Sequence, residues 1–283
     1  MEDLMISVIT GASAGIGAAA AVELARRGHR LVLVGRDAGR LAEVAGRVAG
    51  VTAASGPDAG SGAAPDTLTC DYTSFDDVRA LAAELRSRYP RIDVLINNAG
   101  VMTTQRTLTR DGHETMMQVN HLSPFLLTNL LLDRVAGRVI TTSSRAGKSG
   151  RLDPADLDRE RRKWSGWLQY GDSKQANALF TVELARRLAG TGVSATCFHP
   201  GVIKTGFAPG TLMMWMVKHI PGMGQTAEEG ASTMVHLATH PDGADHPGRY
   251  FADRAPAAVP RGMSDPERAR ALWDASAAAV GLD

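Results

Sequence analysis

The feature that most constrains the fold is a glycine-containing loop between a predicted strand and a predicted helix. Apolar residues Met5–Ile9 precede Thr10-Gly-Ala-Ser-Ala-Gly-Ile-Gly17, and Ala18–Arg27 has the composition of a helix that Gly28 ends. Glycines let a backbone approach a phosphate closely, and a helix N-terminus offers unpaired N–H groups and a positive dipole end. This order predicts a nucleotide-binding strand–loop–helix unit. A tight turn that binds no ligand is the alternative.

Apolar runs and helical patterns alternate along the rest of the chain. The predicted strands after the first are Arg30–Val34, Thr67–Cys70, Ile92–Ile96, Gly137–Thr142, Val193–Phe198 and Arg249–Ala252. The predicted helices are Ala38–Ala49, Phe75–Arg88, Glu114–Leu132, Tyr170–Leu188, Thr226–Thr239 and Asp265–Val280. This alternation predicts a single α/β domain over residues 1–283, with a doubly wound, mainly parallel seven-stranded sheet and helices on both faces.

Three helices carry more specific expectations. Pro124 lies inside Glu114–Leu132 and is expected to kink or break it. Thr226 and Glu229 have the spacing of a capping box. The final helix is expected to close a sheet edge or a subunit interface.

Composition excludes several kinds of protein. The 283 residues carry a formal net charge of +1, which gives no strong field for nucleic acid. The two cysteines, Cys70 and Cys197, lie in apolar runs, and no CxxC or Cys/His ligand spacing is present, so we expect neither a metal nor a disulfide. We expect no signal peptide and no transmembrane segment, and hence a cytoplasmic protein. Residues 50–65, rich in Gly, Ala and Ser, are expected to form a flexible insertion.

The ends of the second and third strands predict how a dinucleotide would be selected. At the second strand end, an acidic residue favours a free 2′-hydroxyl, whereas an arginine can pair with a 2′-phosphate. Arg36 therefore favours NADP(H) over NAD(H), unless it is a solvated surface charge. Asp37 suits the N-cap of the following helix. Asp71 could accept a hydrogen bond from the adenine amino group or cap the next helix, and both possibilities stay open.

The pentapeptide Tyr170-Gly-Asp-Ser-Lys174 is the candidate catalytic centre. If it begins a helix, Tyr170 and Lys174 share one face. A nearby ammonium favours the phenolate and would lower the pKa of the tyrosine from about 10 toward the pH at which a general acid or base works best. The alternative is an amphipathic helix start that carries these residues by chance.

Four motifs in this order resemble the classical short-chain dehydrogenase/reductase family. They are TGASAGIG at 10–17, NNAG at 97–100, a serine after the fifth strand, and YGDSK at 170–174. Three longer stretches resemble the group that includes retinol dehydrogenases and protochlorophyllide reductases, namely residues 109–132, HPGVIKT at 199–205 and GRYFADRAP near 248–256. The resemblance implies a Rossmann fold and an oxidoreductase that interconverts a carbonyl and an alcohol on a small or lipophilic metabolite. Reduction of a carbon–carbon double bond and a non-catalytic dinucleotide sensor or scaffold are the alternatives.

The resemblance also implies roles for individual residues. Tyr170 would transfer the proton, Lys174 would lower its pKa and hold the ribose, Ser144 would polarise the substrate oxygen, and Asn120 would support a water relay. Ser143 is the alternative to Ser144, and a helix-interior amide that satisfies freed backbone groups is the alternative for Asn120. The expected cofactor contacts are Gly11, Ser13, Ala14, Gly15, Ile16, Gly17, Arg36, Asp71, Tyr72, Asn98, Ala99, Gly100, Tyr170, Lys174, Pro200, Ile203 and Thr205.

Two segments are expected to flank the substrate. The charged stretch 151–167 is interpreted as a helical flap at the site rim, with a solvated surface turn as the alternative. The methionine-rich stretch at 205–224 is interpreted as a substrate lid, with a membrane or partner contact as the alternative. His199 precedes a proline at a strand end, which favours a structural role. We expect a homodimer or homotetramer that acts on a small molecule.

Overall fold

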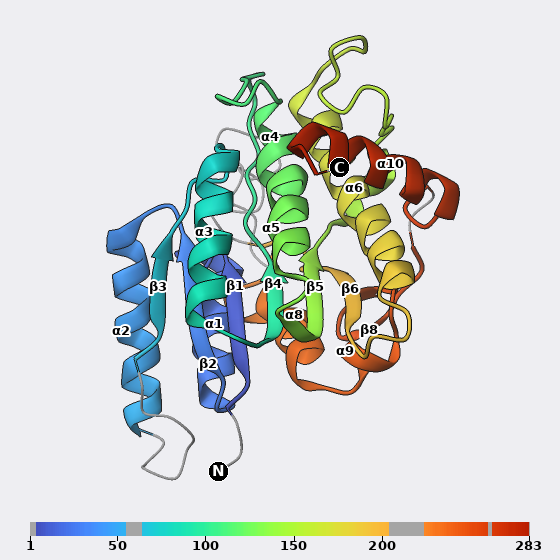
Figure 1. Ribbon diagram of the computed structural model, residues 1–283. Helices are drawn as coiled ribbons and strands as arrows, with labels where there is room; N and C mark the ends of the chain where they lie inside the picture. The colour runs from blue at the N-terminus through green and yellow to red at the C-terminus, as the bar shows by residue number, and fades with distance from the viewer. Residues whose placement is uncertain (1–3, 55–63, 204–223, 260–261, 283) are drawn as a thin grey trace.

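The computed structural model describes residues 4–54, 64–203, 224–259 and 262–282. Within these residues, one eight-stranded sheet runs in the order β3-β2-β1-β4-β5-β6-β7-β8, with helices on both faces (Figure 1). Its strands are β1 (Ile6–Thr10), β2 (Arg30–Gly35), β3 (Asp66–Thr69), β4 (Ile92–Asn97), β5 (Val135–Thr142), β6 (Ser194–His199), β7 (Tyr250–Ala252) and β8 (Ala255–Pro256). The pairings from β3 to β7 are parallel, so the carboxyl ends of these strands meet at one edge. The predicted doubly wound α/β fold is confirmed.

The eighth strand is the one departure from the predicted seven-stranded sheet. β8 is two residues long and pairs antiparallel with β7. The two residues that join them, Asp253 and Arg254, have φ values of 51° and 63°. Left-handed backbone at both central positions matches the twist of a tight hairpin, but glycine or asparagine usually marks such a turn. The sequence therefore lacked the usual signal for it.

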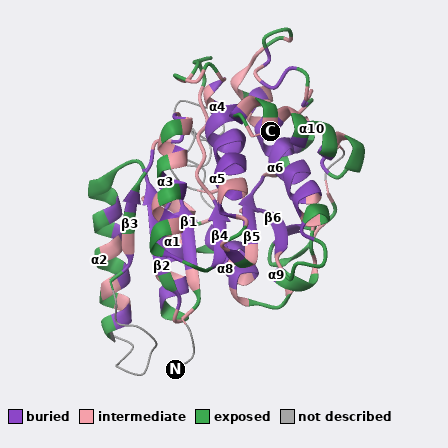
Figure 2. Cartoon of the chain, in the orientation of Figure 1, coloured by how far each residue is buried: buried purple, intermediate pink, exposed green. Residues whose placement is uncertain are grey.

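The helices enclose two apolar cores, one on each face of the sheet. The first core is lined by α3 (Phe75–Arg88), α5 (Ser123–Leu131) and α6 (Gly166–Arg187). The second is lined by α1 (Gly15–Arg26), α2 (Ala38–Ala54) and α8 (Ala227–Thr239), with α9 (Asp242–Asp245) following α8. Buried residues run along the strands and the inner sides of these helices (Figure 2). Of the predicted caps, the Thr226–Glu229 box is formed, and the Asp37 carboxylate accepts from the Arg40 N–H at 3.0 Å.

The predicted helix 114–132 is interrupted before its proline. It consists of α4 (Thr115–Met117), a π-helical turn η1 (Gln118–Leu122) and then α5. Pro124 lies in the first turn of α5, which continues directly from the π turn, and it has no N–H to donate to a carbonyl of that turn. The irregularity is thus a widened turn, a feature often found at functional sites, and Asn120 lies within it.

The segment before α6 is not helical, so the predicted helical flap is wrong over residues 151–165. This stretch consists of turns and irregular backbone, although Leu152 and Leu157 are buried. Arg159 has a φ of 49°, which a right-handed helix excludes. α6 begins at Gly166, one turn before Tyr170, and the Ser165 hydroxyl caps it by accepting from Leu168 N–H at 3.3 Å.

The C-terminal helix α10 (Pro266–Val280) lies on α5 and α6 rather than at the sheet edge. The Trp273 ring lies 4.9 Å from the Phe125 ring and 5.9 Å from the Phe180 ring, measured between centroids. The Arg187 guanidinium lies 4.2 Å from the centroid of the Trp273 ring. Apolar packing against α5 and α6 therefore fixes the position of α10, and α10 does not cover the edge of the sheet.

Candidate active site

Three strand ends and one helix define the candidate site. The carboxyl end of β5 adjoins the first half of α6, where Lys174 donates to the Thr142 carbonyl, and the loop after β4 lies beside the end of β1. Asn98 joins two of these ends, because its Nδ2 donates to the carbonyl oxygens of Thr10 at 3.0 Å and Gly11 at 3.3 Å. The Thr10 hydroxyl accepts from the backbone N–H groups of Asn98 and Ala99. The NNAG loop is thereby fixed beside the glycine loop.

The glycine loop has the backbone geometry that a phosphate cradle requires. Gly11 has a φ of +66°, and an added Cβ there would come within 2.8 Å of Ala99 Cα. Gly15 has a φ of +56°. Ala14 is the N-cap of α1 and makes no side-chain capping bond, and no acidic residue lies in the first turn. The α1 N-terminus therefore keeps backbone donors and a positive dipole end that fit the pyrophosphate of a dinucleotide.

Arg36 and Asp71 follow the ends of β2 and β3. Arg36 is exposed immediately after Gly35, the last residue of β2. One Asp71 oxygen accepts from the backbone N–H of Thr73 at 3.0 Å and from its hydroxyl at 2.9 Å, whereas Ser74 is the N-cap of α3. Asp71 thus shapes the turn before α3 without capping the helix itself. Tyr72 is buried beside it.

Tyr170 and Lys174 lie on one face of α6, as predicted. Lys174 Nζ lies 5.6 Å from the centroid of the Tyr170 ring and donates to the Thr142 carbonyl at 3.2 Å. Burial lowers the pKa of Lys174 to about 8. Burial raises the pKa of Tyr170, and a hydrogen bond with Ser144 opposes that rise. The expected lowering of the tyrosine pKa is therefore not found in the protein alone, because burial of the phenol outweighs its hydrogen bond with Ser144.

The two adjacent serines have different partners. The Ser143 hydroxyl is buried and donates to the Lys174 carbonyl at 2.7 Å, so it joins β5 to α6. The Ser144 hydroxyl is half-buried, accepts from Ala146 N–H at 3.2 Å and is hydrogen-bonded to Tyr170. Ser144 is therefore the serine that shares the site with the phenol.

Asn120 connects the π turn to two neighbouring segments. Its Oδ1 accepts from Val101 N–H at 2.7 Å, and its Nδ2 donates to the Val101 carbonyl and to Ser173 Oγ, both at 3.0 Å. It is fully buried. These partners lie outside its own helix, so the alternative that the amide satisfies freed backbone groups of that helix is wrong. Asn120 fixes the loop after NNAG against α6 beside Lys174.

The loop after β6 completes the described part of the site. His199 accepts from Arg145 N–H at 3.4 Å, and burial lowers the pKa of His199 to about 4. A neutral ring held between backbone segments agrees with the expected structural role. Pro200 follows it, and Ile203 forms an isolated bridge with Gln225. Thr205 and most of the predicted lid, residues 205–223, lie outside the described residues.

An ion-paired cluster behind α6 was missed by sequence reasoning. Asp172 is fully buried and accepts from Arg159 Nε at 2.8 Å and from Arg151 N–H at 2.6 Å. Asp158, in the same segment, contacts His113 Nδ1 at 2.8 Å. The signal in the sequence that could have revealed this cluster is Asp172. It lies two residues from both Tyr170 and Lys174, and this spacing places it on the opposite side of α6.

One cavity lies away from these residues. It has a volume of about 670 Å³ and is lined by α1, α2 and α8, including Arg26, Arg47 and Glu228. Among the residues that the structure describes, none of the predicted catalytic or cofactor residues lines it. In the part of the chain that the structure describes, no helix is long and apolar enough to cross a membrane.

Comparison with known proteins identifies the family. Residues 5–212 match the family described as short chain dehydrogenase. The chain is 44% identical over 275 residues to a Streptomyces sp. (strain C5) protein provisionally named daunorubicin C-13 ketoreductase DnrU, covering 97% of this chain and 92% of that one. It is 39% identical over 292 residues to Mus musculus retinol dehydrogenase 14, covering 97% and 85%.

A solved structure of an uncharacterised protein from Mycobacterium paratuberculosis superposes with a TM-score of 0.77 at 34% identity, covering 98% of this chain and 93% of that one. The glycine loop, the parallel sheet and the relatives agree with the resemblance to the retinol-dehydrogenase-like group. The chain therefore belongs to the short chain dehydrogenase family and is an NAD(P)-dependent oxidoreductase that acts on CH–OH and C=O groups.

Proposed function

We propose that this protein is an NADP(H)-dependent carbonyl reductase whose proton donor is Tyr170. The observation that carries the proposal is the hydrogen-bonded pair of Ser144 and Tyr170 at the carboxyl end of β5, with Lys174 on the same face of α6. The names of the relatives support carbonyl and alcohol substrates, including bulky lipophilic ones.

The chain's own residues would divide the work as follows. The bound nicotinamide supplies or accepts hydride. Ser144 donates a hydrogen bond to the substrate oxygen as negative charge develops on it. Tyr170 transfers a proton to that oxygen during reduction and removes it during oxidation. Lys174 would hold the ribose. Asn120 would keep the loop at Val101 and the helix at Ser173 in place beside Lys174 through its hydrogen bonds to both.

Cofactor choice would rest on Arg36. It is exposed at the end of β2, and a guanidinium can pair with a 2′-phosphate through two parallel hydrogen bonds. Asp37 is engaged in capping α2, so its carboxylate is directed to a backbone N–H. Titration of NADPH and NADH into wild type and Arg36→Ala should show an NADPH preference that the substitution removes. Equal binding of both cofactors to wild type would contradict this assignment.

Turnover is tested with a panel of aromatic and aliphatic ketones and aldehydes. The consumption of NADPH is measured for each compound, and the product is then identified. Tyr170→Phe should lower kcat by about 10²–10⁴ while NADPH still binds, because only the proton donor is lost. An alcohol product supports carbonyl reduction, whereas a saturated carbon–carbon bond would assign the other reaction. Unchanged turnover in Tyr170→Phe would refute the role given to the phenol.

A further inference from the structure

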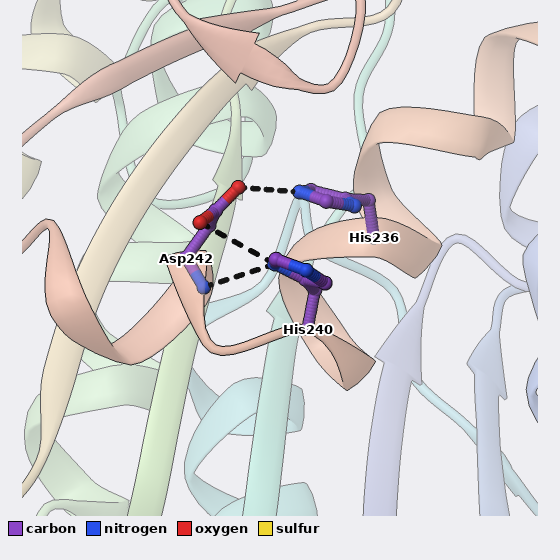
Figure 3. Close-up of side chains that lie close together, drawn as sticks. All are labelled: His236, His240 and Asp242. Carbon is purple, nitrogen blue, oxygen red and sulfur yellow. Dashed lines mark hydrogen bonds and ion pairs between the residues drawn. The ribbon is translucent and has the colours of Figure 1, made fainter.

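Two histidines and an aspartate converge where α8 ends and α9 begins (Figure 3). His236 Nε2 lies 2.8 Å from one Asp242 oxygen, and His240 Nδ1 lies 3.3 Å from the other. The two imidazole rings are stacked, with centroids 4.4 Å apart and planes 18° apart. One ligand atom from each residue lies within 4.8 Å of the other two.

The backbone fixes this convergence. His236 and His240 are four residues apart and share one face of the helix end. His240 is the C-cap of α8, and its backbone N–H donates to the His236 carbonyl at 2.8 Å. Arg138 Nη1 donates to the Leu237 and His240 carbonyls at 2.6 and 2.7 Å, so the last turn is held to β5.

His240 Nδ1 lies between two groups of Asp242. The backbone N–H of Asp242 donates to it at 3.3 Å, and Asp242 Oδ1 lies 3.3 Å from it. The contact with the N–H fits a lone pair on that nitrogen, and a neutral imidazole nitrogen with a lone pair is the form that binds a metal ion.

We propose that His236, His240 and Asp242 bind a divalent transition-metal ion of the zinc class, with water completing the coordination. Imidazole nitrogen with carboxylate oxygen suits Zn²⁺, Ni²⁺ and Cu²⁺ rather than Mg²⁺ or Ca²⁺, which prefer oxygen alone. The helix C-terminus adds the negative end of the α8 dipole.

The site is structural and separate from the chemistry at Tyr170. Its ligands lie at the amino end of the β strands, since Arg138 is in β5 near its start and Ser194, the first residue of β6, donates to the Gly243 carbonyl at 2.6 Å. The candidate active site lies at the opposite, carboxyl edge. A bound ion would fasten α9 to the end of α8.

The test is calorimetric titration of ZnCl₂ into the full chain, without a histidine tag and after removal of metal with a chelator. MgCl₂ serves as the control ion. Wild type should bind one Zn²⁺ and no Mg²⁺, and Zn²⁺ should raise its unfolding temperature. Loss of an outer partner of a ligand costs about 10–100-fold in affinity, so His240→Ala and Asp242→Asn should each weaken Zn²⁺ binding at least about 100-fold.

His246→Gln is the matched control, because it removes a nearby histidine that is not one of the three ligands. It should bind Zn²⁺ like wild type. Co²⁺ in place of Zn²⁺ should give a visible ligand-field absorption that His236→Ala abolishes. Failure of wild type to bind one Zn²⁺ would overturn the proposal, as would equal Zn²⁺ affinity in wild type and the ligand variants. None of these readouts depends on cofactor or turnover.

Discussion

The ion pair between Arg159 and Asp172 should be among the largest single contributions of side-chain charge to stability. The two side chains are 4% and 0% exposed, and their atoms lie 2.8 Å apart. Removing one member of a buried pair typically costs 3–5 kcal/mol, because it leaves the other charge buried and unpaired. In Arg159→Met, Arg162 Nη1 remains 3.6 Å from the Asp172 carboxylate and is 25% exposed. We therefore expect the lower end, a loss of about 3 kcal/mol.

A double-mutant cycle measures this pairing directly. Urea unfolding of wild type, Arg159→Met, Asp172→Leu and the double variant gives four free energies of unfolding. The double variant should lose less than the sum of the single losses by about 2 kcal/mol or more, since no unpaired charge is left. Arg26→Met is the control, because its partner Glu23 is 37% exposed and a surface pair contributes about 0–1 kcal/mol. Additive losses, or a single loss as small as that of the control, would refute the reasoning.

Three further predictions follow from the described contacts. Ser144→Ala should lower kcat by about 10²-fold with little change in the free energy of unfolding. Ser143→Ala should lower the free energy of unfolding by about 1 kcal/mol, because its hydrogen bond to the Lys174 carbonyl is lost. Both variants are measured by kinetics and by urea unfolding, and the reverse pattern would exchange the two roles. Burial lowers the pKa of His121 to about 4, whereas in the unfolded chain it is about 6.5, so the unfolded state takes up a proton first as pH falls. The free energy of unfolding of wild type should therefore decrease between about pH 6.5 and about pH 4, and this dependence on pH should be weaker in His121→Asn. Equal pH dependence in the two proteins would contradict a buried neutral ring. Trp273→Ala should cost about 3–5 kcal/mol, measured by urea unfolding, because α10 is held on α5 and α6 by that ring; a loss below about 1 kcal/mol would mean that other contacts hold the helix.

The fold could be predicted because its signals are local. Strand, glycine loop and helix follow one another within residues 6–26, and parallel strands joined by helices permit few topologies. The π turn at Gln118–Leu122 could not be predicted, since Asn120 is held there by partners on the loop at Val101 and on α6. The hairpin at Asp253 and Arg254 was missed because, although aspartate is enriched at a positive φ, arginine in place of the usual glycine at the second position gives no such signal.

The choice between Ser143 and Ser144 shows where sequence reasoning about the site ends. Both hydroxyls follow β5, and only their three-dimensional partners separate them, one buried on the Lys174 carbonyl and one beside the Tyr170 phenol. Whether the pKa of Tyr170 is raised or lowered could not be predicted from the sequence either. Spacing placed Lys174 on the same face of α6, but the pKa of Tyr170 is raised by burial of the phenol, which depends on the packing of segments far apart in the sequence.

α6 explains why the chemistry and its support occur within one short motif. Tyr170 and Lys174 face the strand ends, and a row spaced three residues apart faces the segment 151–165. Gln169 donates to the Leu157 carbonyl at 3.0 Å, Asp172 binds Arg159, and Gln175 accepts from Leu152 N–H at 2.9 Å. Because a rigid helix transmits displacement from one side to the other, loss of the Asp172 contact should disturb the phenol even though it touches no reacting atom. We therefore expect Asp172 to act as a positioning residue for Tyr170.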